Sequence, residues 1–488
     1  MKIVIVGGVA GGASAAARLR RLDENSEIIM FERGEYISFA NCGLPYYIGG
    51  TIEERDDLLV QTPEDMKDMF GIDVRIESEV TAIDRDSRTV LVRNRKTGRE
   101  YRESYDRIIL SPGAVPVKPP IPGIDLENIF TLRTVPDTDA IKEAVDSRKG
   151  DKAVVVGGGF IGLEMAENLH SRGMDVSIVE AAEQVMAPID YEMACMVHNH
   201  ILSKGVKLYL KDGVKAFHKK GRRVNVELQS GKSVEADMVI LAIGVKPDIS
   251  LAVNAGLETG QRRGIKVNKY LQTSDPDIYA VGDAIEVKDF VNGGDTVIPL
   301  AGPASKQGRT AANNICGANE EYKGTQGTSV VKVFDLTVAA TGSSEKLLKR
   351  MGIEHDKCYT ESNSHAGYYP GASPMNIKLL YAPDGKVIGA QIVGYDGVDK
   401  RIDVLASAVR FGKTVYDLEE LELAYAPPYS SAKDPVNMAG YVAANQLKGD
   451  VEVIHWHGLN EAKKGKYFVL DVRLPEEANE GFIGTKRF

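Results

Sequence analysis

The chain contains the same βαβ pattern twice, and this repeat constrains its fold more than any other feature. Residues 1–32 and 151–180 each run through a β-branched apolar stretch, a glycine-rich turn, a segment with small and apolar residues at three-to-four spacing, a second apolar stretch and a final glutamate. That order is typical of a strand, a helix and a second, parallel strand. The repeat predicts an α/β protein with two such units.

The second copy carries a complete glycine motif. Gly157, Gly159 and Gly162 fit GxGxxG between a predicted strand and a predicted helix. In this motif the first glycine makes a tight turn, the second lets backbone N–H groups approach a pyrophosphate, and the third lets helix and strand pack closely. Glu180 follows where a carboxylate can bind ribose hydroxyls. Because alanines and no arginine follow at 181–182, we expect this dinucleotide-binding, Rossmann-like unit to take NADH rather than NADPH.

The first copy departs from this motif. Val9 stands at the second glycine position, between Gly7 and Gly12 at the first and third. The neighbouring glycines would therefore have to provide the close backbone approach to a dinucleotide. The candidate cofactor-binding residues of this copy are Gly7, Gly11 and Gly12, with Gly8 beside them, and Glu32 at the end of the second strand.

A third segment, residues 273–286 (TSDPDIYAVGDAIE), supports cofactor binding by the first copy. It predicts a short strand, 278–281, that runs into Gly282 and Asp283. Such a turn can present Asp283 to the ribityl and phosphate part of a flavin. The alternative is an ordinary aspartate-capped turn between a strand and a helix.

Composition and charge exclude several classes of protein. The length of 488 residues indicates roughly three domains of about 150 residues each. The net charge of -9 argues against a nucleic-acid surface, which needs clustered Lys and Arg. The N-terminus shows no signal-peptide pattern, and no apolar run is long enough to span a bilayer. We therefore expect a cytoplasmic protein without a membrane or nucleic-acid partner.

The pattern of cysteines and histidines predicts neither a disulfide framework nor a metal site. His198 and His200 are two residues apart, so on a helix they would lie on different faces. The four cysteines are widely spaced, with no CxxC and no zinc spacing. They are Cys42, Cys195, Cys316 and Cys358.

Nearly the whole chain, to about residue 447, resembles the flavoprotein disulfide reductases with two dinucleotide folds. The resemblance rests on the two βαβ units and on the segments LSPGAVP (110–116), LAIGVKPD (241–248) and IYAVGDA (278–284). It implies two Rossmann-like domains, one binding FAD and one binding NADH, and an α+β dimerisation domain that makes a homodimer. The implied boundaries are 1–112 with 250–325 for FAD, 113–249 for NADH and 326–447 for dimerisation.

Within that family, the segment SFANCGLPY (38–46) implies a single redox-active cysteine, Cys42. Ordinary members have a CxxxxC pair, but Tyr47 stands where the second cysteine would be. The segment resembles the form found in coenzyme A disulfide reductases and in relatives that reduce coenzyme A persulfides. NADH would deliver hydride to FAD, the flavin would reduce oxidised Cys42, and the freed thiolate would attack the next sulfur–sulfur bond. This exchange requires a lowered pKa at Cys42; the alternative is an inert buried cysteine.

The same resemblance implies a site for coenzyme A, whose phosphates need cations. Arg18 and Arg21 are three residues apart on the first predicted helix, which places them on similar faces. Lys306, in PLAGPASKQGR, falls where relatives often have a basic residue. Asn41, with Ser38 in the same segment, is expected to position the substrate or the cysteine. For each cation, a solvated surface residue is the alternative.

Two tyrosine-rich segments supply further candidates. Residues 365–374 and 424–435 are rich in Pro and Gly and therefore predict loops. In coenzyme A disulfide reductases, tyrosines at the positions of Tyr368 and Tyr425 reach the active-site cysteine of the partner subunit, where a phenol can donate a proton. The neighbouring tyrosines at 369 and 429 are the alternatives if the register differs, and packing tyrosines are common.

The family pattern also assigns two residues on the helix after the second glycine motif. Phe160 is expected to gate the nicotinamide pocket, and Glu164 to orient the nicotinamide carboxamide. Without the resemblance they would be a core aromatic residue and an acid on the helix surface.

The last residues, 452–488, resemble the opening of a rhodanese domain. YFVLDVRLPEEANEGFIG (467–484) predicts a strand, a charged turn and a short helix, but no nucleophilic cysteine follows. We expect a fragment of a longer chain that neither folds nor transfers sulfur by itself; an ordinary tail is the alternative. A rhodanese partner would favour persulfide or polysulfide over coenzyme A disulfide alone.

These features together predict an FAD- and NADH-dependent homodimeric enzyme that reduces coenzyme A disulfide, coenzyme A persulfide or polysulfide through Cys42, with coenzyme A as a bound ligand. One alternative is an NADH oxidase in which Cys42 cycles through a sulfenic acid. Another is a flavin-bearing redox-sensing protein without turnover.

Overall fold

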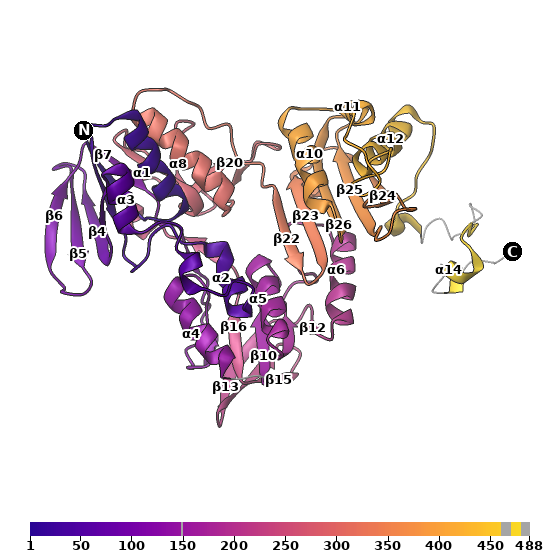
Figure 1. Cartoon of the computed structure of the whole chain (residues 1–488), viewed down its shortest axis with the longest axis horizontal. Helices are drawn as coiled ribbons and strands as arrows, with labels where there is room; N and C mark the ends of the chain where they lie inside the picture. Colours follow the sequence, from indigo (N-terminus) through magenta and orange to yellow (C-terminus); the bar gives the residue numbers. More distant parts are fainter. Residues whose placement is uncertain (148–149, 460–469, 480–488) are drawn as a thin grey trace.

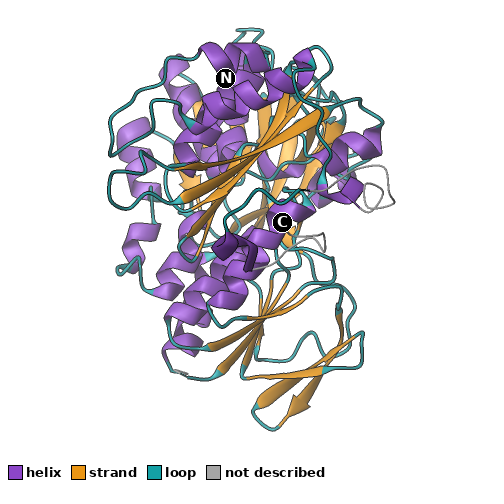
Figure 2. Ribbon diagram, turned by 90° about the vertical axis from the view of Figure 1, so that its right-hand side faces the viewer, coloured by secondary structure: helices purple, strands orange, loops and turns teal. Residues whose placement is uncertain are grey.

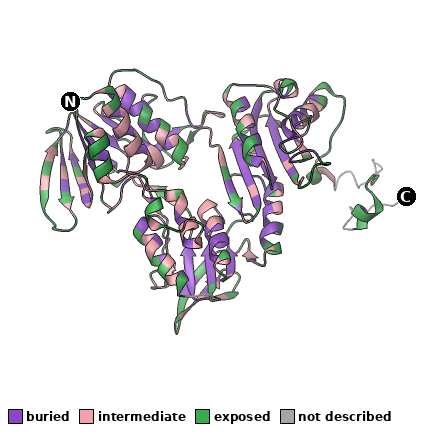
Figure 3. Cartoon of the chain, viewed as in Figure 1, coloured by how far each residue is buried: buried purple, intermediate pink, exposed green. Residues whose placement is uncertain are grey.

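The computed structural model describes residues 1–147, 150–459 and 470–479. The described chain forms three lobes, each built on its own five-stranded sheet (Figure 1). Buried side chains run along the strands of all three sheets, and the exposed residues lie on the outer helix faces and hairpins (Figure 3). Within these residues, no helix has the length and apolar character needed to cross a bilayer.

The first lobe contains the first predicted βαβ unit. Its sheet has the order β19-β7-β1-β2-β3 with all strands parallel. These strands are β1 (Lys2–Val6), β2 (Glu27–Phe31), β3 (Asp73–Arg75), β7 (Arg107–Leu110) and β19 (Ile278–Ala280). The helices of this lobe are α1 (Ala10–Leu22), α3 (Pro63–Phe70), α7 (Ser250–Asn254) and α8 (Ala301–Ile315). Two smaller sheets consist of β4 (Ser78–Asp84), β5 (Thr89–Asn94) and β6 (Glu100–Ser104), and of β18 (Ile265–Lys266), β20 (Ile285–Lys288) and β21 (Asp295–Thr296).

The second lobe repeats the arrangement with the second predicted βαβ unit. Its parallel sheet has the order β12-β11-β10-β16-β9, and α5 (Phe160–Ser171) connects β10 to β11. The strands are β9 (Ile129–Phe130), β10 (Lys152–Val156), β11 (Asp175–Val179), β12 (Lys207–Tyr209) and β16 (Met238–Leu241). The lobe also contains α4 (Val135–Asp146), α6 (Tyr191–Ser203) and a sheet of β13 (Val214–Lys220), β14 (Arg223–Leu228) and β15 (Ser233–Ala236). Both predicted units are therefore confirmed.

The chain crosses between these two lobes through LSPGAVP and LAIGVKPD. These segments contribute β8 (Ala114–Pro116) and β17 (Val245–Pro247), which pair as an antiparallel ribbon. One early helix also changes lobe, because α2 (Leu44–Gly49) packs against α4 and α5. Leu44 and Ile48 are fully buried in the core of the second lobe. The helix that follows Cys42 is thus anchored in the second lobe, although its sequence belongs to the first.

The third lobe is antiparallel, as the predicted α+β domain requires. Its sheet has the order β22-β23-β26-β25-β24, and the helices α10, α11 and α12 pack beside it (Figures 1 and 2). The strands are β22 (Ser329–Val333), β23 (Leu336–Gly342), β24 (Asp356–Asn363), β25 (Pro374–Tyr381) and β26 (Val387–Gly394). The helices are α9 (Glu345–Met351), α10 (Val398–Arg410), α11 (Val415–Glu420) and α12 (Pro435–Lys448).

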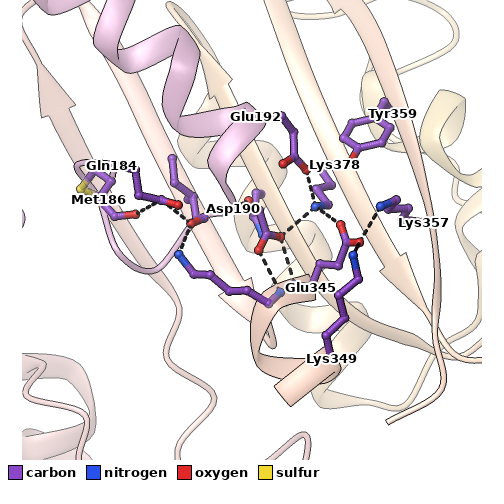
Figure 4. Close-up of polar contacts among 12 residues, drawn as sticks. Gln184, Met186, Asp190, Glu192, Glu345, Lys349, Lys357, Tyr359 and Lys378 are labelled. Carbon is purple, nitrogen blue, oxygen red and sulfur yellow. Dashed lines mark hydrogen bonds and ion pairs between the residues drawn. The ribbon is translucent and has the colours of Figure 1, made fainter. Parts of the chain in front are cut away.

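A buried cluster of charges joins α6 of the second lobe to the third lobe (Figure 4). The ammonium group of Lys378, which is fully buried on β25, pairs with Asp190, Glu192 and Glu345. Lys357 also pairs with Glu345. The three carboxylates lie within 4.8 Å of one another, a spacing that suits a metal ion. Here, the Lys378 ammonium pairs with all three carboxylates.

The C-terminal segment is described in part. Within 470–479, the short helix α14 (Pro475–Asn479) is present as expected, and no strand is assigned to 470–472. Val472 is 84% exposed, so this stretch does not contribute to a core. The remainder of the predicted strand and helix, 467–469 and 480–484, lies outside the described residues.

Candidate active site

The two glycine loops have the same construction. Gly7 and Gly157 adopt φ of +98° and +110°, and a Cβ on either would lie about 2 Å from a backbone carbonyl oxygen of the adjacent strand end. Gly12 and Gly162 begin the helices so close to these loops that an added Cβ would lie 1.9 Å and 2.0 Å from the carbonyl oxygens of Gly7 and Gly157. These positions therefore require glycine for turn geometry and for packing.

The acid at the end of each unit is held against its own glycine loop. Glu32 accepts hydrogen bonds from the backbone N–H groups of Gly8 (2.9 Å) and Gly34 (2.8 Å). Glu180 accepts one from the N–H of Gly158 (2.7 Å). Both carboxylates are thereby fixed beside the loops, where cofactor binding was predicted for both and ribose binding for Glu180.

The second glycine position differs between the two copies. No atom lies within 4 Å of a Cβ built on Gly159, so this loop has open space where a pyrophosphate is expected. A Cβ on Gly8 would instead meet Ile37, and one on Gly11 would meet Ser111 and Val281. Gly8 and Gly11 are therefore required for packing against these residues, and their backbone approach to a dinucleotide stays a prediction.

The loop that carries Cys42 is tied to the first glycine loop. The N–H of Ser38 donates to the carbonyl of Gly8 over 2.8 Å, and Ser38 has φ of +43°, a strained value for a residue with a side chain. A short 3₁₀ turn, Asn41–Gly43, then leads directly into α2. Cys42 is thus held between the first glycine loop and a helix anchored in the second lobe.

Charged groups from three separate segments surround Cys42. Asp283 follows β19 in the first lobe, Glu164 lies on α5, and Arg133 precedes α4. Arg133 Nη2 lies 3.4 Å from Asp283 Oδ2. Cys42 is exposed at the surface of the chain, but desolvation by the protein around it raises the pKa of its thiol, the Glu164 and Asp283 carboxylates raise it further, and Arg133 partly opposes them. The expectation of a lowered pKa is therefore wrong for the polypeptide alone.

Glu164 is not the surface acid that its position on a helix allows. Burial raises the pKa of this carboxyl group to about 7, and a hydrogen bond from Tyr46 partly opposes the shift. Tyr46 is four residues after Cys42 and so lies on the same side of the turn. Phe160, at the first position of α5, is partly buried against the core of the second lobe.

The predicted cations lie on two helices that pack against each other. A Cβ on Gly308 of α8 would lie 2.3 Å from the carbonyl oxygen of Gly11 on α1, so the two helices are in close contact. Arg18 donates to Asn313 of α8 over 2.8 Å, and Lys306 is exposed on the same helix. The guanidinium of Arg21 instead lies 5.3 Å from the ring centre of Phe70 on α3. Arg18 and Arg21 therefore contact different neighbours, Asn313 on α8 and Phe70 on α3.

The two tyrosine-rich segments form adjacent loops on the third lobe. The hydroxyl oxygens of Tyr368 and Tyr425 lie 2.6 Å apart, although the residues are 75% and 47% exposed. Tyr369 packs edge-on against the His365 ring, and Tyr429 is largely exposed. In the described part of one chain, neither member of the hydrogen-bonded pair contacts Cys42. The pair is therefore presented outward from the chain that carries it.

Sequence reasoning missed two residues near the cysteine. Tyr46 could have been found from its place near the start of α2, directly after the short turn that carries Cys42. Arg133 had no such signal, because only the packing of the two lobes brings it to Asp283.

The fold and this site match a known family. The chain belongs to the pyridine nucleotide-disulphide oxidoreductases: the main domain of that family matches residues 1–308, and its dimerisation domain matches residues 328–435. The protein is thus an oxidoreductase. Family membership confirms the predicted fold class and the cofactor classes, a flavin and a pyridine nucleotide.

Similar proteins carry several names within this family. The chain is 56% identical to the reduced CoADR-RHD of Bacillus anthracis, with a TM-score of 0.97, covering 100% of this chain and 88% of that one. It is 40% identical to an NAD-dependent persulfide reductase from A. fulgidus, with a TM-score of 0.90 and coverage of 93% and 85%. It is 38% identical to a coenzyme A disulfide reductase of Staphylococcus haemolyticus, over 91% of this chain and 99% of that protein. An NADH oxidase of Methanocaldococcus jannaschii is 37% identical, with coverage of 92% and 99%.

Proposed function

We propose that the protein is a homodimeric, FAD- and NADH-dependent reductase of coenzyme A disulfide and coenzyme A persulfide, with Cys42 as its redox-active thiol. The observation that carries the proposal is the position of Cys42 between Asp283 of the first lobe and Glu164 of the second. The other three cysteines are remote in sequence, and all four are free thiols. A single thiol between a flavin unit and a nicotinamide unit suits sulfur exchange without a resolving cysteine.

The proposed domains follow the lobes. Residues 1–112 and 250–325 would bind FAD, 113–249 would bind NADH, and 326–447 would form the dimer. The glycine loops support this assignment, because Gly7 and Gly157 begin Rossmann-like turns and Gly159 leaves open space for phosphate. Asp283, at the end of β19, is placed beside Cys42 and would contact the flavin. When bound, FAD supplies two electrons that it accepts as hydride from NADH.

A preference for NADH rests on Glu180. Its carboxylate is fixed by the N–H groups of Gly158 and Ala182, at 2.7 Å and 2.8 Å. A fixed carboxylate accepts hydrogen bonds from the 2′-hydroxyl of NADH and repels the 2′-phosphate of NADPH.

The sulfur chemistry follows from a single nucleophile. The Cys42 thiolate attacks coenzyme A disulfide, forms a mixed disulfide with one half and releases the other as a thiolate. Two electrons from NADH, together with one proton, then convert the mixed disulfide back to a Cys42 thiolate and a second coenzyme A thiol. With coenzyme A persulfide, attack on the outer sulfur leaves a persulfide on Cys42, which the same two electrons reduce to hydrosulfide.

The proton for the leaving thiolate would come from the partner subunit. Tyr368 and Tyr425 share one short hydrogen bond and point outward, so they can reach a site on a second chain. Lys306, Arg18 and Arg21 would bind the coenzyme A phosphates from the α1 and α8 side, with Ser38 and Asn41 nearer the thiol. A cytoplasmic location, where NADH and reduced thiols coexist, stays a prediction.

The test is anaerobic NADH consumption by the flavoprotein with coenzyme A disulfide, with coenzyme A persulfide, and separately with oxygen alone. We expect turnover on a sulfur substrate that disappears in Cys42→Ser and survives in the matched variant Cys316→Ser. Cys42-dependent turnover with oxygen alone, while both sulfur compounds stay inert, would make the protein an NADH oxidase. Reduction of the flavin by NADH without any turnover would favour the redox-sensing alternative.

A further inference from the structure

Below the Tyr368–Tyr425 pair lies a buried cation that the proposed chemistry does not use. Arg401 extends from α10 and is 1% exposed. It pairs with Asp434, whose side chain is equally buried and caps the N-terminus of α12. A buried ion pair by itself contributes little net stability, because desolvation offsets the attraction. The role of Arg401 therefore depends more on the other hydrogen bonds that its guanidinium makes.

Those hydrogen bonds connect both tyrosine loops. Arg401 Nη2 lies 3.0 Å from the carbonyl oxygen of Ser364, at the start of the loop that carries Tyr368. The same nitrogen lies 3.2 Å from the carbonyl oxygen of Tyr429 and 3.1 Å from Ser430 Oγ, in the loop that carries Tyr425. Nη1 donates to the carbonyl of Gly397 at the start of α10 over 3.2 Å. One guanidinium thus fixes both loops to the same helix.

The second loop is held mainly by polar contacts, which include the hydrogen bond from Ser430 Oγ to Asp434 over 2.6 Å. Residues 424–426, 428 and 429 border a cavity of about 370 Å³, so one side of this loop has no packed core against it. Between the loops, the N–H of Ala366 donates to the carbonyl of Ser430 over 3.0 Å. Polar contacts therefore set the position of Tyr425 relative to Tyr368. Arg401 is the side chain that makes hydrogen bonds to both tyrosine loops in the described residues.

We infer that Arg401 is a positioning residue for the reaction: it holds the two loops so that the hydroxyls of Tyr368 and Tyr425 act as one hydrogen-bonded pair towards the partner's thiol. This inference rests on the proposed function. A lysine at 401 would keep the charge beside Asp434, but it cannot contact three backbone segments at once, because it lacks the planar fork of arginine.

The experiment compares full-length holoenzymes that carry Arg401→Lys, the double change Tyr368→Phe with Tyr425→Phe, and all three changes. Arg410→Lys, at the far end of α10, is the matched control, because Arg410 contacts Phe290 and the Gly324 carbonyl instead. The readouts are kcat and KM with coenzyme A disulfide, the rate of flavin reduction by NADH, and amide hydrogen exchange of 365–374 and 424–435.

We expect Arg401→Lys to lower kcat at least tenfold and to speed hydrogen exchange in both loops, with flavin reduction by NADH unchanged. When both tyrosines are already phenylalanine, adding Arg401→Lys should lower kcat by no more than a further twofold, because the hydroxyl pair that Arg401 positions is absent. Unchanged exchange, unchanged kcat, or an equal loss in both backgrounds would overturn the inference. If the unmodified protein reduces neither sulfur compound, the proposed function fails, and the exchange data still decide whether Arg401 holds the loops.

Discussion

The hydroxyl oxygen of Tyr46 lies 3.4 Å from a carboxylate oxygen of Glu164, and this contact joins the helix that follows Cys42 to the helix of the second glycine motif. Burial raises the pKa of Glu164 to about 7, and the hydrogen bond from the Tyr46 hydroxyl keeps this pKa from rising further. The carboxyl group therefore changes its charge near neutral pH, beside the cysteine.

Removal of the Tyr46 hydroxyl should raise the pKa of Glu164. In Tyr46→Phe, the ionised carboxylate loses a donor, so the pKa of Glu164 should rise by up to about one unit. The measurement is the pH dependence of flavin reduction by NADH, with an inflection near pH 7 expected in the unmodified protein. An inflection that persists unchanged in Glu164→Gln would assign it to another group.

The reactivity of Cys42 should respond to its charged neighbours in opposite directions. The Glu164 carboxylate raises the pKa of the thiol, so Glu164→Gln should increase the thiolate fraction and the rate of alkylation by iodoacetamide. Arg133→Met should slow alkylation, because Arg133 lowers that pKa. We expect roughly three- to tenfold effects at pH 8, where Glu164 is ionised, and a smaller Glu164→Gln effect at pH 6. Cys42→Ser gives the background from the other thiols; equal rates in all variants at pH 8 would contradict the assignment.

Lys378 should be essential for stability near neutral pH. Lys378→Met would leave Asp190, Glu192 and Glu345 without their shared counter-ion, at a cost of about 3–5 kcal/mol. The control Lys349→Met removes only a largely exposed partner of Glu345 and should cost less than about 1 kcal/mol.

The pH dependence of this change has a defined sign. Burial would raise the pKa of each of the three carboxylates, but lysine partners hold it below its usual range: Lys378 for Asp190 and Glu192, and Lys349, Lys357 and Lys378 for Glu345. In the unmodified protein, their contribution is therefore present above about pH 4 and lost as the pH falls further. In Lys378→Met, buried carboxylates would take up protons more readily, so the deficit should shrink from pH 7.5 to pH 5. Thermal unfolding at both pH values measures it, and a deficit that grows at pH 5 would contradict this account.

Two glycines of the second motif should tolerate substitution differently. In Gly162→Ala, the new Cβ would lie 2.0 Å from the Gly157 carbonyl oxygen, so the protein should lose about 1–3 kcal/mol or more of stability. Gly159→Ala meets no protein atom within 4 Å and should unfold normally, but its KM for NADH should rise. Unfolding curves and NADH titrations separate the two effects; equal stability of both variants would be inconsistent with the close contact at Gly162.

Those features of the fold that depend on local sequence pattern, such as the two glycine turns, could be predicted from the sequence. Gly7, Gly12, Gly157 and Gly162 have roles that follow from the order of strand, turn and helix, and these four contacts are present. In contrast, Leu44 and Ile48 anchor α2 in the core of the second lobe. No local sequence pattern predicts that α2 packs there.

The electrostatic features could not be predicted in the same way. The direction of the pKa shift at Cys42 depends on desolvation by the surrounding protein and then on Glu164 and Asp283, which come from different lobes. Arg401 reads as an ordinary charged residue on an amphipathic helix, and its role appears only when two distant loops meet it. The tight packing at Gly8 and Gly11 could not be predicted either, because the residues that meet them, Ile37 and Val281, are remote in sequence.

The outward direction of the Tyr368–Tyr425 pair has a genetic consequence. If one chain supplies the thiol and its partner supplies the phenols, each reaction centre is shared, and a defect in either component disables only the centre to which that component contributes. A chain with Cys42→Ser and a chain with both tyrosines changed to phenylalanine would each form an inactive homodimer. Co-expressed, they would form a mixed dimer in which one centre carries both defects and the other carries none. Two null alleles would therefore complement each other.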